Sequence, residues 1–205
     1  MKLRRSFFAR PSPEVARDLL GKVLARRTGD ALLRGRIVET EAYTGASDPG
    51  SHAFRGPTPR NQVMFGEAGH LYVYFTYGMH HCVNVVTDQP GTAGAVLLRA
   101  LEPLEGIEVM EANRSGRPLR DLCNGPGKLC QSFGITRDQN GDDLEGSDIW
   151  IEDDGFRANA VATSTRVGLS AGADLPFRFF VQGNPFVSRG ERPGGPGVRR
   201  QREKA

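Results

Sequence analysis

The sequence predicts an α+β fold, with one domain built on a largely antiparallel sheet and short helices around it. The chain has 205 residues, a length that suits a single domain with its own core. Short runs rich in β-branched and aromatic residues follow one another through its middle. Helical patterns lie towards the ends of this series. A succession of strands with helices at the ends is typical of α+β proteins.

The first predicted element is a short helix over the sequence EVARDLL. Ser12 can cap this helix, and Pro13 suits the first helical position, where a missing backbone N–H does no harm. Helical spacing places three apolar side chains on one stripe: Val15, Leu19 and Leu20. We expect this stripe to be buried against the sheet.

Strands dominate after this helix. The predicted strands are Lys22–Arg26, Arg34–Tyr43, His70–Thr76, Cys82–Thr87, Ala95–Leu101, Asp148–Glu152 and Phe177–Val181. Short helices are expected at Glu105–Ala112 and Gly125–Phe133. A long loop rich in Gly, Pro, Ser and Arg follows the second strand, and such loops are usually functional or disordered. We expect one domain over residues 1–188 and a basic, disordered tail over residues 189–205.

Charge is distributed unevenly although the net charge is only +3. Residues 1–27 hold eight Lys and Arg against two acids, whereas residues 138–154 hold eight acids and no Lys or Arg. Basic ends permit a polyanionic partner, but composition alone favours ordinary solvated charge. The three cysteines are too few for a disulfide framework, which favours a reducing compartment. We find no secretory signal and no apolar run near the roughly 20 residues that span a bilayer, so we expect a cytoplasmic protein.

The segment RGRIVETEAY carries the most informative pattern. Side chains alternate between the two faces of a strand. A strand here places four side chains on one face: Ile37, Glu39, Glu41 and Tyr43. A carboxylate beside an aromatic ring suits an enzyme that holds a flat ring and activates a water next to it. Periodicity alone does not choose between Glu39 and Glu41.

The segment HLYVYFTYG is the second informative pattern. The same alternation groups His70, Tyr72, Tyr74 and Thr76, and leaves Tyr77 at a turn. One interpretation is a strand packed with amphipathic aromatic side chains, which is common. The other is a stacking pocket for a flat ring, with an exposed tyrosine at the turn that could wedge between base pairs.

Metal binding is disfavoured by the spacing of the histidines and cysteines. Adjacent residues on a strand point to opposite faces, so His80, His81 and Cys82 do not converge. Cys123 and Cys130 also miss the usual zinc spacing. We therefore expect neither a metal nor a cofactor.

The segment GPGK resembles a phosphate-binding loop only superficially. Leu129 stands where such a loop has the Ser or Thr that holds magnesium. Backbone amides at a helix start, together with Lys128, could still hold a nucleic-acid phosphate. A plain helix start explains the segment equally well.

Several segments, in order, resemble the alkyladenine (3-methyladenine) DNA glycosylases of the mammalian-type fold. The matching segments are ETEAY, TPRN, MF, YVYFTYGMHHCVN, VLLRALEP, LEG, GPGKLCQ, RVGL and RFFVQGNPFVS. They span the chain from about Phe8 to Ser188, so we expect a member of bacterial length, without the long N-terminal extension of some eukaryotic relatives. The resemblance implies a curved, largely antiparallel sheet. It also implies base excision repair, in which damaged purines are flipped out of duplex DNA and cleaved from the sugar.

The resemblance assigns the catalytic and stacking roles. Glu41 matches the general base that deprotonates a water, and Arg99 matches the basic residue near that water and the lesion phosphate. Tyr43 matches the aromatic on one side of the flipped base. His52 and Tyr74 match the residues on its other side.

The resemblance also assigns the contacts around the base. Asn84 matches the residue that crowds the purine 2-position, and Tyr77 matches the side chain that intercalates into DNA. Lys128 and Arg137 align with residues that contact the DNA backbone. Glu39 is then best interpreted as a structural partner for an arginine.

The expected activity is that of a monofunctional DNA-3-methyladenine glycosylase, because no lysine occupies a matched catalytic position to act as a Schiff-base nucleophile. Its substrates would be duplex DNA with 3-methyladenine, 7-methylguanine, hypoxanthine or ethenoadenine. We expect a monomer that is associated with the nucleoid and has no membrane partner. The alternatives are a non-catalytic nucleic-acid-binding module and a nucleoside hydrolase.

Overall fold

The structure is a computed structural model that describes residues 1–76 and 78–188. Its strands are β1 (Val23–Thr28), β2 (Ala31–Thr44), β3 (Leu71–Thr76), β4 (His80–Thr87), β5 (Gly94–Glu105), β6 (Ile149–Glu152), β7 (Val161–Ser164) and β8 (Arg178–Val181). Its α-helices are α1 (Arg5–Phe8), α2 (Ser12–Asp18), α3 (Ile107–Asn113), α4 (Leu119–Leu122) and α5 (Pro126–Phe133). Two short 3-10 helices complete the described elements, η1 (Gln62–Phe65) and η2 (Arg137–Gln139).

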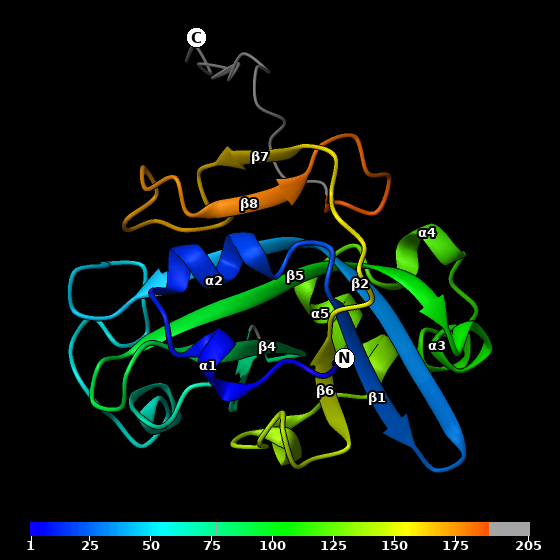
Figure 1. The fold of residues 1–205 in the computed structure, drawn as a ribbon, viewed down its shortest axis with the longest axis horizontal. Coiled ribbons are helices and arrows are strands. Elements are labelled where there is room, and N and C mark those ends of the chain that lie inside the picture. The colour runs from blue at the N-terminus through cyan, green and yellow to red at the C-terminus, as the bar shows by residue number, and fades with distance from the viewer. Residues whose placement is uncertain (77, 189–205) are drawn as a thin grey trace, which may run out of the picture.

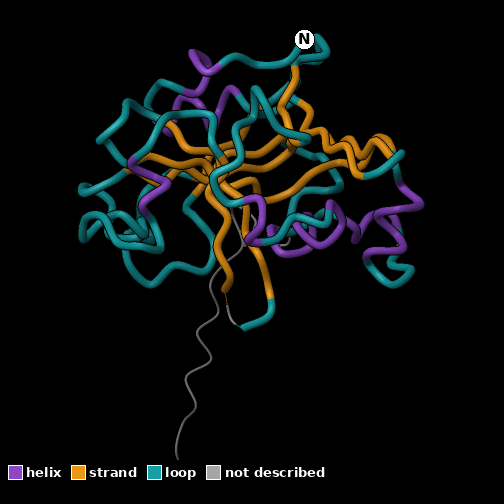
Figure 2. Tube along the Cα trace, turned by 90° about the horizontal axis from the view of Figure 1, so that it is seen from below, coloured by secondary structure: helices purple, strands orange, loops and turns teal. Residues whose placement is uncertain are grey.

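The strands form one curled sheet in which every described pairing is antiparallel. The order is β3-β4-β5-β2-β1-β6, and β8 pairs with both β2 and β7. Figure 1 shows the long strands β2 and β5 crossing the molecule, with short helices around them. In the view from below, the strands gather at the centre and the helices and loops surround them (Figure 2). These features confirm the predicted α+β class and its antiparallel sheet.

Helix α2 packs against the sheet through the predicted stripe. Val15 is fully buried within the helix, and Leu19 and Leu20, fully and nearly fully buried, directly follow its last residue, Asp18. The prediction that Ser12 caps the helix was wrong. Ser12 is the first helical residue, after Pro11, and the helix has no side-chain cap. The buried Ser12 hydroxyl instead donates a 3.1 Å hydrogen bond to the carbonyl of Tyr43. This bond ties the helix to the end of β2.

The central strands separate two groups of apolar side chains. Val85 and Val96 pair across β4 and β5 and point into the main core. Their neighbours Val86 and Ala95 pair in the next row and point to the other face, because alternate residues of a strand face opposite sides. The smaller cluster on that face contains Ala53, Met64, Tyr72, Val86, Ala93 and Ala95. It forms the base of the candidate site.

Strand β2 does not keep the strict alternation that the sequence predicts. Its pairing with β5 shifts register between Ile37 and Glu39, and again between Glu39 and Thr40. Such bulges re-aim the side chains next to them. Ile37 therefore packs in the main core instead of sharing the face of Glu41, so its predicted placement was wrong.

Some elements differ from the prediction. The sequence analysis missed the short helices α1 and α4 and the strand β7. Strand β5 continues through Pro103 to Glu105, so the next helix starts later than expected, at Ile107. The predicted tail over residues 189–205 lies outside the described residues. Over the part of the chain that the structure describes, every helix is too short or too polar to cross a membrane.

Candidate active site

A cavity on the second face of the sheet contains the predicted base-binding residues. It encloses about 350 Å³, including its open mouth, and its lining residues are Tyr43, Gly50, His52, Met64, Tyr72, Tyr74, Asn84, Ala95 and Leu169. Four of these were predicted from the sequence: Tyr43, His52, Tyr74 and Asn84. They come from β2, β3, β4 and the loop after β2, so the fold brings together residues that lie far apart in the chain.

One wall of the cavity is a group of aromatic rings. The rings of His52 and Tyr74 meet edge to face, with centroids 4.5 Å apart. Nδ1 of His52 lies 2.9 Å from the hydroxyl oxygen of Tyr72. Burial lowers the pKa of His52, and the positive charge of Arg60 lowers it further. The imidazole is therefore mainly neutral at neutral pH and can stack without adding a buried charge.

Tyr43, another residue of the cavity lining, is joined to Glu41. The Tyr43 hydroxyl donates a 2.8 Å hydrogen bond to Oε2 of Glu41. Burial, followed by the charge of Glu41, raises the pKa of Tyr43 far above its usual value, so the hydroxyl stays protonated and able to donate. The backbone N–H of Val167 donates to Oε1 of Glu41 at 2.8 Å. Glu41 is fully buried and does not itself line the cavity, but both donors fix its carboxylate beside Tyr43.

Arg99 links the two carboxylates of β2. Its guanidinium lies 3.2 Å from Oε1 of Glu39 and 3.3 Å from Oε1 of Glu41. Burial alone would lower the pKa of Arg99, but Glu41 and Glu39 outweigh that effect and raise it. Arg99 therefore stays charged beside Glu41.

Glu39 has a different environment from Glu41. Nε of Arg178 donates to its Oε1 at 2.7 Å, in addition to Arg99. Ser188 donates twice, from its backbone N–H at 2.7 Å and from its hydroxyl at 2.9 Å. Glu39 is thus a partner for arginines, as the sequence analysis expected, and its oxygens are occupied by protein donors.

Sequence reasoning missed a buried ion pair behind Tyr43. The guanidinium of Arg166 lies over the Tyr43 ring, 4.6 Å from its centroid, and binds the carboxylate of Asp48. Arg166 packs against this ring but is not among the residues that line the cavity. No local pattern predicts this pair, because the two residues are separated by 118 positions.

Tyr72 and Arg60 were also missed, although both had a sequence signal. Alternation grouped Tyr72 with Tyr74, and Arg60 lies in the matched segment TPRN. The Arg60 guanidinium lies 5.4 Å from the centroid of the Tyr74 ring. Burial raises the pKa of Tyr72, and the charges of Arg60 and Arg137 oppose that rise. Both arginines are therefore close enough to act on the cavity wall.

Lys128 and Arg137, two of the remaining predicted DNA contacts, do not line the cavity. Lys128, near the start of α5, is partly exposed and donates a 2.6 Å hydrogen bond to the side chain of Asn124. Arg137 lies in η2. Tyr77 lies outside the described residues. On either side of it, Phe75 and Met79 are 46% and 68% exposed, which leaves two apolar side chains at this end of the β3–β4 hairpin in water.

The histidine and cysteine cluster on β4 shows no metal-binding arrangement. Among the described residues, no group of three or more His, Cys, Asp or Glu side chains is placed to hold an ion. Cys82 is buried, and burial raises the pKa of its thiol. His80 and His81 lie at the exposed start of the strand.

Comparison with known proteins gives matches along most of the chain. The family model described as methylpurine-DNA glycosylase (MPG) matches residues 6–185. A protein of Koribacter versatilis named "Putative 3-methyladenine DNA glycosylase" is 51% identical over 191 residues, which cover 91% of this chain and 92% of that protein. A protein of the same name from Alkaliphilus oremlandii is 44% identical, over 92% of this chain and 100% of the relative. Another, from Burkholderia lata, is 52% identical, over 91% of this chain and 90% of the relative.

A buried carboxylate beside an aromatic cavity, together with these matches, defines a DNA glycosylase, an enzyme of base excision repair that acts on DNA. Among DNA glycosylases, the chain belongs to the methylpurine-DNA glycosylase family. The resemblance that the sequence segments indicated is therefore confirmed.

Proposed function

We propose that this chain flips damaged purines out of duplex DNA and hydrolyses their N-glycosidic bonds with a water activated by Glu41, leaving an abasic site. The observation that carries the proposal is the fixed position of the Glu41 carboxylate. It is buried beside Tyr43, held by donors from Tyr43 and Val167, and accompanied by the charged Arg99. The substrates are 3-methyladenine, 7-methylguanine, hypoxanthine and ethenoadenine, and the enzyme acts as a monomer.

The cavity supplies the binding of the flipped base. Enzymes that act on a base remove it from the helical stack and hold it between aromatic or apolar side chains. Tyr43 on one side and His52 with Tyr74 on the other provide such surfaces, and base–aromatic stacking contributes roughly 1–3 kcal/mol per base. Damaged bases unstack at lower cost than normal ones, which adds selectivity before any contact is made. Asn84, at the base of the cavity, excludes the 2-amino group of guanine.

The chemistry requires one base and one cation. Departure of the purine develops positive charge at the sugar C1′, and the anionic Glu41 stabilises that charge while accepting a proton from the attacking water. Arg99 holds the lesion phosphate near this water. The lining of the described cavity contains no lysine, so no Schiff-base intermediate forms and the enzyme does not cleave the strand.

Contacts outside the cavity bind the duplex. Lys128 and Arg137 neutralise backbone phosphates, which makes binding salt-dependent through counterion release. Tyr77 enters the stack and fills the gap that the flipped nucleotide leaves. A nucleoside hydrolase would need neither the basic contacts nor the wedge.

A duplex oligonucleotide with one central hypoxanthine or ethenoadenine tests the proposal. Incubation followed by alkali should give strand scission at the lesion, with no scission before alkali and no base release from free nucleosides. Glu41→Gln should bind the same duplex but release the base about 100- to 10,000-fold more slowly. No release by the wild type from any of the lesions would refute the proposal. Binding without release would favour a non-catalytic DNA-binding module.

A further inference from the structure

The ion pair of Asp48 and Arg166 lies behind the candidate site and has no role in the chemistry proposed above. Neither side chain is exposed. The guanidinium binds both carboxylate oxygens, with Nη1 2.6 Å from Oδ2 and Nη2 2.7 Å from Oδ1. It also donates to the carbonyl oxygens of Ala42 and Gly172, each at 3.0 Å. Desolvating two charges is costly, so the stability that the pair itself contributes does not explain a pair this deeply buried.

The arginine contacts both groups that hold the Glu41 carboxylate. Its guanidinium packs on the ring of Tyr43, whose hydroxyl donates to Glu41. The next residue along the chain, Val167, gives the backbone N–H that also donates to Glu41. A displacement of Arg166 would therefore move both donors together.

The aspartate arranges the loop that forms the rim of the cavity. Oδ2 of Asp48 accepts a hydrogen bond from the N–H of Thr44 at 3.2 Å, at the end of β2. Oδ1 accepts from the N–H of Gly50 at 2.9 Å. Gly50 lines the cavity two positions before His52. The orientation of the Asp48 carboxylate therefore fixes the path of the chain from Tyr43 to His52.

The two loops approach the guanidinium too closely for a side chain to be added. A Cβ atom on Gly50 would lie 2.9 Å from Nη2 of Arg166, and one on Gly172 would lie 3.0 Å from the same atom. The loop after β2 and the loop between β7 and β8 are therefore packed tightly against the Arg166 guanidinium, which leaves little room for either loop to shift.

We propose that the Asp48–Arg166 pair is a positioning clamp that sets Tyr43 and Glu41 in their working geometry. The proposal rests on the proposed function, in which Glu41 is the base and Tyr43 a wall of the base pocket. Asp48 and Arg166 touch neither the flipped base nor the water. They are positioning residues that act through Tyr43, Val167 and the loop bearing His52.

The first test is the single-turnover rate of Asp48→Asn at saturating enzyme on an ethenoadenine duplex. Asparagine keeps the shape of the side chain but replaces one acceptor by an NH₂ group that faces the guanidinium. The rate should fall by about 10- to 100-fold, because a misplacement of about 1 Å costs up to that factor. The Kd for undamaged duplex should stay within about twofold, since both side chains of the pair are fully buried.

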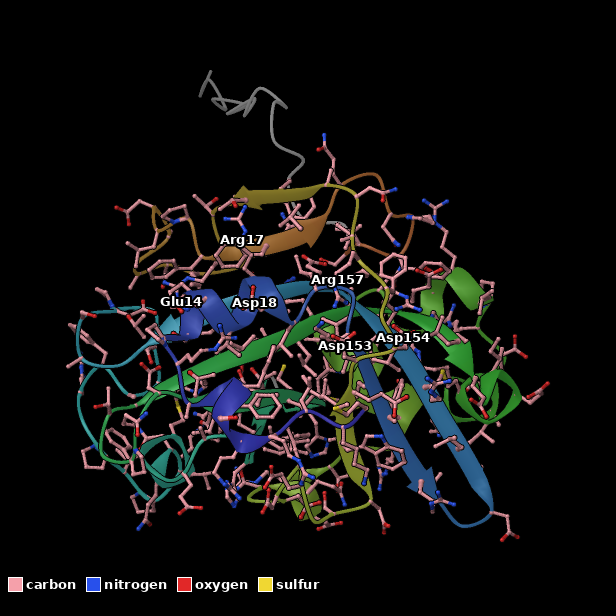
Figure 3. The ribbon with its side chains drawn as sticks, viewed as in Figure 1. Glu14, Arg17, Asp18, Asp153, Asp154 and Arg157 are labelled. Atoms are coloured by element: carbon pink, nitrogen blue, oxygen red, sulfur yellow. The ribbon has the colours of Figure 1, made fainter. Side chains whose placement is uncertain are left out.

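A matched control is Asp154→Asn. Asp154 also pairs with both terminal nitrogens of an arginine, Arg36, at 3.1 and 2.9 Å, and this arginine packs on Phe156 at 4.1 Å. Figure 3 shows Asp154 beside Asp153 and Arg157, well apart in this view from the loop that follows β2. Its excision rate should match that of the wild type.

A double-mutant cycle separates positioning from a general effect on the fold. Tyr43→Phe removes the hydroxyl that donates to Glu41. If the clamp acts through that hydrogen bond, Asp48→Asn with Tyr43→Phe should lose less rate than the product of the two single losses. Arg166→Lys provides a second clamp variant, because lysine keeps the charge but does not reproduce the paired bonds. It should show the same coupling with Tyr43→Phe.

The outcomes are distinct from those of the proposed function. A wild type that releases no base, with every variant equally inactive, would refute the proposed function. An active wild type with an inactive Glu41→Gln, but with Asp48→Asn and Arg166→Lys at wild-type rates, would overturn the clamp alone. Multiplicative losses in the cycle would overturn it too. Failure of both clamp variants to fold, seen by circular dichroism, would show that the pair serves stability and would also overturn the proposal.

Discussion

Replacing Glu39 by glutamine is expected to reduce stability, whereas replacing Glu41 by glutamine is expected to reduce the rate of base release. Both carboxylates are fully buried on β2. The Glu39 carboxylate accepts hydrogen bonds from Arg99, from Arg178 and twice from Ser188. Glutamine has the same shape but only one oxygen, and its NH₂ group would face donors. Arg178 would then lose the anion it pairs with, whereas Arg99 would keep Glu41 at 3.3 Å.

The size of the effect follows from that arrangement. Removing one partner of a buried ion pair typically costs about 3–5 kcal/mol, because the other charge is left uncompensated. For a domain of this length, 1 kcal/mol corresponds to roughly 2–4 °C in Tm, so the Tm of Glu39→Gln should fall by roughly 6–20 °C. In Glu41→Gln, Arg99 keeps Glu39 as its partner. We therefore expect a loss of only about 1 kcal/mol there, close to that of one hydrogen bond.

Urea unfolding followed by circular dichroism at pH 7 measures the free energy of unfolding, and an unchanged m-value keeps the comparison valid. Glu152→Gln serves as a control, because Glu152 pairs with Arg34 near the surface and such pairs contribute about 0–1 kcal/mol. Single-turnover excision supplies the rate. A loss below about 1 kcal/mol in Glu39→Gln would refute the reasoning. A slower excision by Glu39→Gln than by Glu41→Gln would reverse the roles of the two residues.

Four further predictions concern the cavity and the DNA contacts. Tyr43→Phe should lower the single-turnover rate by about 10-fold at unchanged affinity for damaged duplex, since it removes one bond to a charged group; an affinity loss of the same size would contradict this. Asn84→Ala should release some guanine from undamaged duplex, measured by chromatography of free bases, and no release would disprove the crowding role. Because burial and Arg60 lower the pKa of His52 below 6.5, the folded state binds fewer protons than the unfolded state at acidic pH. The contribution of His52 to stability is therefore complete above about pH 6.5 and lost as the pH falls below it, so the urea midpoint should drop more between pH 7.5 and 5.5 in the wild type than in His52→Gln. Lys128→Ala should reduce the slope of log Kd against log salt by about 1, and an unchanged slope would exclude a phosphate contact.

Local patterns predicted the parts of the site that lie within one strand. Alternation correctly grouped Glu39 with Glu41 on β2, and Tyr72 with Tyr74 on β3, because every second side chain of a regular strand points to the same face. The same rule failed at Ile37. A bulge there depends on the partner strand β5, and its presence is not written in the sequence of β2 alone.

Contacts across long separations could not be predicted from periodicity. The N–H of Val167 reaches Glu41 across 126 positions, and Asp48 reaches Arg166 across 118. Strand β7 was missed because VATS is short, polar and only partly buried. It is defined by its pairing with β8, which local propensity does not encode.

The contact between Ser188 and Glu39 has a consequence for folding during synthesis. A chain made from its N-terminus contains Glu39 and Arg99 long before it contains Arg178 and Ser188, since 149 positions separate Ser188 from Glu39. Until those partners emerge, Glu39 has Arg99 but lacks the hydrogen bonds from Arg178 and Ser188, so burying its charge is less favourable and the centre of the sheet closes late. Pairings this distant also fold slowly. The half-made chain can pair β2 with β1 as a hairpin, but the pairing of β2 with β8 has to wait until the last described strand is made.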